Sequence, residues 1–115
     1  PLPENAVRED QGYAAVNGLI RDKVDFDGLF CANDFIALGA MRALDENHIA
    51  VGTDVRVIGF DGIATGAYAQ PPLTTIEQDY VEAGEMLVEA LIAVLKGDAP
   101  NIAPVPVKLL KRGTA

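Results

Sequence analysis

The sequence contains no serine and no tryptophan, and it has a single cysteine, Cys31, and a single histidine, His48. A Ser-His-Asp triad is therefore excluded, because its nucleophile is missing. A Cys-His pair is disfavoured, because Cys31 lies inside an apolar run and His48 falls near the expected end of a helix. These two residues are also too few for a tetrahedral zinc site with nitrogen and sulfur ligands. We expect no metal and no cofactor.

Basic residues are scarce as well: 9 Lys and Arg stand against 17 Asp and Glu, which gives a net charge of −8. This charge disfavours contact of the segment with nucleic-acid phosphates or an anionic membrane, so any DNA contact must come from elsewhere. Charges interrupt every apolar run before the roughly 18 residues that a membrane-spanning helix needs. A lone cysteine in an apolar strand is typical of a core residue in a reducing compartment. We expect a cytoplasmic protein without membrane contact.

Half of the residues are apolar, which is enough for the core of one modest domain. The apolar run over 28–32 ends at Asn33 and Asp34 and continues with helical periodicity, as when a buried parallel strand leads into a helix. A second expected strand, over 55–60, ends at Asp61. The strands of a right-handed β-α-β unit are parallel, so their carboxyl ends share one edge of the sheet. The three polar side chains should therefore converge where open α/β sheets bind ligands.

The other segments alternate between helical and extended patterns. Asp34 is expected to be the N-cap of the helix that follows the first strand, because a short carboxylate accepts hydrogen bonds from free amide groups. Asp79 stands in the equivalent position before the last helix. Pro106 confines the last strand to an edge or a bulge, and residues 111–114 are expected to be a solvated tail. The expected elements are helices over 8–23, 35–47 and 80–95, and strands over 29–32, 55–60, 73–76 and 105–110.

The converging side chains Asn33, Asp34 and Asp61 suit three kinds of chemistry. Carboxylates accept paired hydrogen bonds from vicinal hydroxyls and Asn both donates and accepts, which suits a sugar or another polyhydroxylated ligand. A divalent cation usually needs more oxygen ligands than the sequence places here. General acid–base catalysis lacks an activated nucleophile or a cofactor motif beside the carboxylates. A structural role also remains open, in which Asp34 caps a helix and Asp61 makes a turn.

The helix expected over 35–47 carries apolar residues around most of its circumference. One face can cover the sheet, but the remainder would be exposed unless another lobe or subunit covers it. The pattern therefore favours an interface. The alternative is a helix that is buried between other elements of its own fold.

Four blocks of the sequence resemble, in the same order, the C-terminal part of the effector-binding domain of LacI/GalR-family transcriptional regulators. They are FCANDFIALGA (30–40), DVRVIGFD (54–61), PPLTTIEQ (71–78) and VKLLKRGT (107–114). The resemblance implies a partial α/β fold, with a parallel sheet in the three-layer arrangement of type I periplasmic binding proteins. It also implies a single partial domain over 1–115, with 1–72 and 103–115 in the C-terminal lobe and 73–102 belonging to the N-terminal lobe of the parent fold. Since the chain starts without methionine, we expect it to be part of a longer polypeptide.

The same resemblance implies the roles of particular residues. Many relatives carry a second acid after the position of Asp61, where this chain has Gly62. The helix over 80–95 would lack its usual lobe, and we expect it to pack on this domain or on a second copy. The implied effector-binding residues are Asn33, Asp34 and Asp61, with Gln78 and Tyr80 near the passage between lobes. The implied dimer contacts are Ile36, Leu38, Met41, Arg42 and Tyr68.

Three functions follow as hypotheses. The first is the effector-binding and dimerising segment of a LacI-type repressor, in which a small molecule, usually a sugar or a purine and here expected to be a sugar, regulates DNA binding allosterically. Operator DNA would then be contacted only through a headpiece outside this chain. The alternative is a periplasmic sugar-binding receptor of an ABC transporter with the same fold. An enzyme that uses Asp34 and Asp61 as an acid–base pair is disfavoured, and we expect no enzymatic activity.

Overall fold

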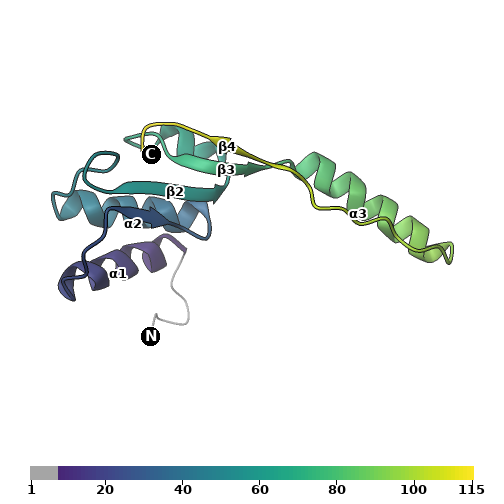
Figure 1. Cartoon of the computed structure of the whole chain (residues 1–115), viewed down its shortest axis with the longest axis horizontal. Helices are drawn as coiled ribbons and strands as arrows, with labels where there is room; N and C mark the ends of the chain where they lie inside the picture. Colours follow the sequence, from purple (N-terminus) through teal and green to yellow (C-terminus); the bar gives the residue numbers. More distant parts are fainter. Residues whose placement is uncertain (1–7) are drawn as a thin grey trace. The chain divides into compact units, whose positions relative to one another are not determined.

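The structure, a computed structural model, describes residues 8–115 and divides into two compact units. We call the first, which comprises residues up to 77 together with 109–115, the core unit. The second comprises residues 78–108, and we call it the helical unit. Figure 1 shows the course of the chain from purple to yellow. The predicted assignment of residues 73–102 to a second lobe of a parent fold stays a prediction.

A four-stranded sheet carries the fold. Its strands are β1 (Gly28–Phe30), β2 (Arg56–Asp61), β3 (Thr74–Gln78) and β4 (Val107–Leu110), in the spatial order β1-β2-β3-β4. The pairs β1-β2 and β2-β3 are parallel, whereas β4 runs beside β3 in the opposite direction (Figure 1). The predicted α/β fold with a parallel-dominated sheet is therefore confirmed. The last strand lies at an edge, as the proline before it requires.

Two helices of the core unit pack against each other through glycine. The helix α2 (Asp34–Glu46) packs on β2, and α1 (Arg8–Arg21) packs on α2 (Figure 1). A Cβ atom on Gly12 would lie 1.9 Å from the Ile36 carbonyl oxygen, and one on Gly39 would lie 1.8 Å from the Glu9 carbonyl oxygen. Only glycine permits so close an approach of the two backbones. Gly12 weakens the intrinsic preference of α1 for helix, but the packing of α1 on α2 requires it.

The core lies between the helices and the sheet and consists mainly of small and aliphatic side chains. Half of them come from α2, because the helix follows β1 directly and the parallel crossover brings it over the next strand. The fully or almost fully buried apolar residues are Val16, Cys31, Ala37, Ala40, Met41, Ala43, Leu44, Val55, Val57 and Leu73.

The prediction of a solvated tail over 111–114 is wrong. Thr114 is fully buried; its hydroxyl donates to the Val57 carbonyl at 2.6 Å and accepts from the Thr74 amide at 2.8 Å. It thereby joins β2 and β3 where their register begins. The Arg112 guanidinium also donates to a backbone carbonyl at 2.9 Å. Buried backbone groups need hydrogen-bond partners, and this segment supplies them from far along the sequence.

The helical unit contains α3 (Tyr80–Leu95). Asp79 is its N-cap, as predicted: the carboxylate accepts from the amides of Val81 at 3.1 Å and Glu82 at 2.9 Å. No residue of α3 is buried, so the expectation that another surface covers this helix stays a prediction. In the described part of the chain, no helix combines the length and apolar character that crossing a bilayer would demand.

Candidate functional site

Asn33 stands after β1, at the edge of the sheet where the parallel strands β1 and β2 end. It is the N-cap of α2, with an extended backbone, and its side-chain oxygen accepts from the Ile36 amide at 2.9 Å. The prediction that Asp34 caps this helix is wrong by one residue. The cap belongs to Asn33 because α2 begins at Asp34, whose side chain is buried. The amide nitrogen of Asn33 is the group that can donate to a ligand.

The carboxylate of Asp34 lies in the interior and is 0% exposed. One oxygen accepts from the Thr75 hydroxyl at 2.5 Å, and the other accepts from the Ile63 amide at 2.8 Å. Predicted as a ligand-binding residue, Asp34 instead directs both oxygens to its own protein. The partners Thr75 and Ile63 come from β3 and from the turn after β2, so the carboxylate joins three segments.

Gly59 makes room for this carboxylate. A Cβ atom at Gly59 would lie 2.1 Å from an oxygen of Asp34, so no other residue fits below it. Sequence reasoning missed both Gly59 and Thr75 as partners of Asp34. The signal for Gly59 was present, because a glycine inside a strand pattern often marks the close approach of another group.

Asp61 ends β2 in an unusual backbone conformation, with a φ of +112°. Gly62 follows with a φ of +78°, so the two residues form a sharp turn. Non-glycine residues rarely adopt positive φ, and such residues are often found at ligand-binding sites. Asp61 is half-buried and stands opposite Glu77 in the register of β2 and β3. Since β1 and β2 are parallel, Asn33, Asp34 and Asp61 follow strands that end at the same edge of the sheet, and their convergence on a ligand stays a prediction.

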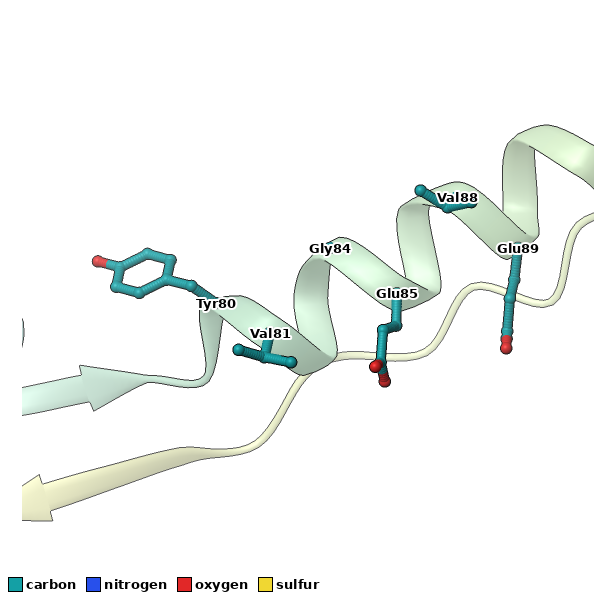
Figure 2. Close-up of a pocket in the computed structure, with 6 residues that line it drawn as sticks. All are labelled: Tyr80, Val81, Gly84, Glu85, Val88 and Glu89. Carbon is teal, nitrogen blue, oxygen red and sulfur yellow. The ribbon is translucent and has the colours of Figure 1, made fainter.

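The other two predicted ligand-binding residues belong to the helical unit. Gln78 ends β3 and is half-buried, and Tyr80 begins α3 and is exposed. Tyr80 lines a surface groove of about 760 Å³ on α3. Figure 2 shows Tyr80 at the start of this helix, with the other lining residues. The apolar side chains of Val81 and Val88 and the carboxylates of Glu85 and Glu89 line the rest of the groove, together with Gly84.

The predicted dimer contacts are divided between the core and the surface. Met41 is only 6% exposed and belongs to the core, whereas Ile36 and Leu38 are half-buried against it. Arg42 is exposed, and Tyr68, in the 3-10 helix η1 (Ala64–Tyr68), is 84% exposed. The helix α2 is thus partly covered by its own fold, as the alternative expected. A groove of about 360 Å³ remains beside it, lined by Leu38, Met41, Arg42, Asp45, Ala69 and Gln70.

Arg42 is tied to neighbouring side chains on α1 and α2. It forms an ion pair with Glu46 at 2.9 Å, and its guanidinium lies 5.2 Å from the centre of the Tyr13 ring. The Tyr13 hydroxyl donates to the second oxygen of Glu46 at 2.5 Å. These hydrogen bonds, first that of Tyr13 and then that of Arg42, lower the pKa of Glu46. The cluster holds the exposed guanidinium at one place on the surface of α2.

Cys31 lines an apolar cavity of about 190 Å³ formed by residues of α1, β1, α2 and the turn between β1 and α2. Burial, with a smaller contribution from the charge of Asp34, raises the pKa of its thiol to about 11. The thiol is therefore protonated at neutral pH and is a poor nucleophile. Among residues 8–115, no three His, Cys, Asp or Glu side chains gather as a metal site would require.

Comparison with known proteins identifies the family. A family model described as a periplasmic binding protein-like domain matches residues 1–115. The HTH-type transcriptional regulator RegA of Clostridium acetobutylicum is 41% identical over 106 residues, which cover 88% of this chain and 31% of RegA. The lactose operon repressor of Escherichia coli is 36% identical over 104 residues, which cover 90% of this chain and 29% of the repressor. The chain thus spans less than a third of the length of these regulators.

Solved structures agree with this result. The lac repressor bound to ONPG in the repressed state superimposes with a TM-score of 0.87 at 34% identity, over 93% of this chain and 33% of that one. A LacI-family regulator from Arthrobacter sp. FB24 in complex with lactose gives a TM-score of 0.78 at 32% identity, over 94% of this chain and 42% of that one. By these names the relatives are regulators rather than enzymes. The chain belongs to the periplasmic binding protein-like family and is a partial effector-binding domain of the LacI family.

Proposed function

We propose that this chain is the effector-binding and dimerising segment of a LacI-type transcriptional repressor, and that the effector is a sugar. The observation that carries the proposal is the pair of polar residues at the carboxyl edge of the parallel sheet. Asn33 ends the β1 turn with an amide that can donate, and Asp61 ends β2 in a strained turn. Functional sites often retain such strain because the surrounding structure holds it.

The chemistry of these groups favours a polyhydroxylated ligand. A carboxylate accepts hydrogen bonds from two neighbouring hydroxyls, and an amide adds a donor, so that one sugar edge satisfies both residues. In this proposal Asn33 and Asp61 of the core unit bind the effector directly, and a role of Gln78 and Tyr80 stays a prediction. Two relatives support the ligand class, because they are described in complex with lactose and with ONPG.

Dimerisation is proposed for the surface beside α2. Its groove includes Leu38 and Arg42, and the exposed Tyr68 adjoins the lining residue Ala69 in the sequence. One relative is described as a lac repressor dimer bound to operator. In a symmetric dimer, the same patch of both subunits forms the contact. Met41 lines the groove mainly from the core side, so Leu38, Arg42 and Tyr68 would supply most of the exposed contact.

Regulation would then follow from a population shift. An effector that binds one arrangement of the protein more tightly than another shifts the population toward that arrangement. The affinity for operator DNA then changes by no more than the ratio of the effector's affinities for the two arrangements. The DNA contact itself would come from a headpiece outside this chain, because the net charge of −8 opposes phosphate binding here. Such a regulator would act in the cytoplasm and would have no enzymatic activity.

The test is calorimetric titration of the full-length polypeptide that contains this chain with lactose, a panel of monosaccharides and a purine base. We expect one sugar to bind, and Asp61→Asn to weaken that binding by about 10-fold or more, because a charged hydrogen-bond acceptor is lost. Asp54→Asn is the matched control, since Asp54 also holds a turn, through the Ala50 amide at 3.0 Å, but lies before β2.

Two outcomes would contradict the proposal. The first is that no sugar binds, and the second is that Asp61→Asn and Asp54→Asn bind the sugar equally well. A sugar-binding protein that retards no operator fragment in a gel-shift assay would favour the transport receptor. Turnover of the bound sugar would favour an enzyme.

A further inference from the structure

Asp34 is the polar residue at the candidate site that a ligand does not reach, because its carboxylate is completely buried. A buried carboxylate is costly unless its oxygens are satisfied, and here each oxygen accepts one hydrogen bond. The donors are the Thr75 hydroxyl on β3 and the Ile63 amide after β2. Gly59 has no side chain, and the carboxylate of Asp34 occupies the space that a Cβ atom at this position would need.

The Ile63 amide lies immediately after the strained turn. Asp61 has a φ of +112° and Gly62 has a φ of +78°, and the next backbone N–H donates to Asp34 at 2.8 Å. A residue such as Asp61 keeps a positive φ only where its surroundings over-determine the conformation. Register with Glu77 fixes one end of this turn, and the bond to Asp34 fixes the other.

We infer that Asp34 is a positioning residue: its buried carboxylate holds the turn 61–63 in place and so sets the direction in which Asp61 faces the effector. The same residue begins α2, directly after Asn33, so it fixes the two effector-binding residues relative to each other. This inference rests on the proposed function, in which Asp61 binds the effector. Its test concerns only the geometry of the turn, so failure of sugar binding and failure of positioning are separate results.

Substitution of Asp34 tests whether its side chain holds the turn. In Asp34→Asn the remaining oxygen can still accept from the Ile63 amide, while the new amide group donates to the Thr75 hydroxyl, which reverses its role. Asp34→Asn should therefore retain the turn. Asp34→Ala removes the acceptor and should release it. Asn also fills the same space as Asp, so the variant that separates a hydrogen-bonded turn from mere filling of space is one that removes the donor at Ile63 and keeps the carboxylate.

A second variant removes the donor and leaves the carboxylate in place. Ile63 has a φ of −63°, which proline adopts without strain, and the preceding Gly62 lacks the Cβ with which a following proline ring would clash. Ile63→Pro deletes the backbone N–H that Asp34 accepts. It keeps the inference testable if Asp34→Ala does not fold.

The experiment is NMR of the labelled full chain, with amide exchange measured at residue 63 and the HN–Hα coupling constant measured at residue 61. The φ of +112° gives Asp61 a small coupling constant, and an extended backbone would give a large one. In Asp34→Ala we expect Ile63 exchange to accelerate by about 10-fold or more and the Asp61 coupling to rise. Asp34→Asn should resemble the wild type, and Ile63→Pro should show the same rise at Asp61.

Asp54→Ala is the control, because its carboxylate holds the Ala50 amide before β2 and should leave residues 61–63 unchanged. The inference is overturned if folded Asp34→Ala or Ile63→Pro keeps the wild-type coupling at Asp61. It is also overturned if Asp34→Asn releases the turn as fully as Asp34→Ala does.

Discussion

Replacement of Gly59 by alanine tests the packing at the centre of the candidate site. The added methyl group would lie 2.1 Å from an oxygen of Asp34 and 3.1 Å from a methyl carbon of Leu73. Leu73 can yield by rotation, but the carboxylate is held by the Thr75 hydroxyl and the Ile63 amide. The variant must therefore either move β2 or displace the carboxylate from at least one partner.

Both routes are expensive. Overpacking of a well-filled interior costs about 1–3 kcal/mol, and a lost hydrogen bond to a charged group costs about 1.5–3 kcal/mol. Since either route is enough, we expect Gly59→Ala to lower the free energy of unfolding by about 1–3 kcal/mol, as measured by urea denaturation. Gly28→Ala in β1 is the matched control, because its nearest neighbour would be 3.9 Å away, and we expect no loss there.

The reasoning is refuted if Gly59→Ala and Gly28→Ala have the same stability. A double-mutant cycle then identifies the cause. In an Asp34→Ala background the clash is absent, so Gly59→Ala should cost clearly less than it does in the wild type. Equal costs in both backgrounds would show that the strand itself, and not the carboxylate, rejects the methyl group.

Three further predictions concern other parts of the core unit. Gly39→Ala should destabilise the fold by about 3 kcal/mol or more in urea, because its Cβ would meet backbone that cannot yield, whereas Gly18→Ala, whose nearest neighbour is 3.9 Å away, should not. Thr114→Val should cost about 2–5 kcal/mol in the same assay, because it leaves two buried backbone groups unpaired, and Thr114→Ser should restore most of the loss. For Cys31, iodoacetamide at pH 8 should react about 100-fold more slowly than in the unfolded chain, because the folded pKa is about 11 against 9.0. Since the unfolded thiol loses its proton first, stability should fall as the pH rises above 9.0.

The parts of the fold that depend on neighbours in sequence were predictable. The strands β1 and β2 and the cap at Asp79 follow from apolar runs and from a carboxylate at the start of a helical pattern. Periodicity locates α2 well, but it fixes a helix end only within a residue or two. That uncertainty explains the confusion of Asn33 with Asp34 as the cap.

The parts that depend on distant partners were not predictable. Asp34 accepts a hydrogen bond from the Thr75 hydroxyl, which is 41 residues away in the sequence. The sequence therefore shows that Asp34 is acidic, but it does not show that the side chain is buried. The contact between α1 and α2 depends on Gly12 and Gly39, each of which appears locally as a weakness in its helix. Thr114 resembled a tail residue, because nothing near it in the sequence indicates that it joins β2 to β3.

The strands β3 and β4 are neighbours that run in opposite directions, and residues 79–106, which form most of the helical unit, connect them. In topological terms this connection is an enlarged hairpin loop. A tight turn of two residues is the usual connection for such a pair of strands. The connection between β3 and β4 is thus a natural site for loop exchange. The core unit would keep Asn33, Asp61 and the groove beside α2. Shortening residues 79–106 to such a turn would give a minimal domain in which these features could be studied without α3.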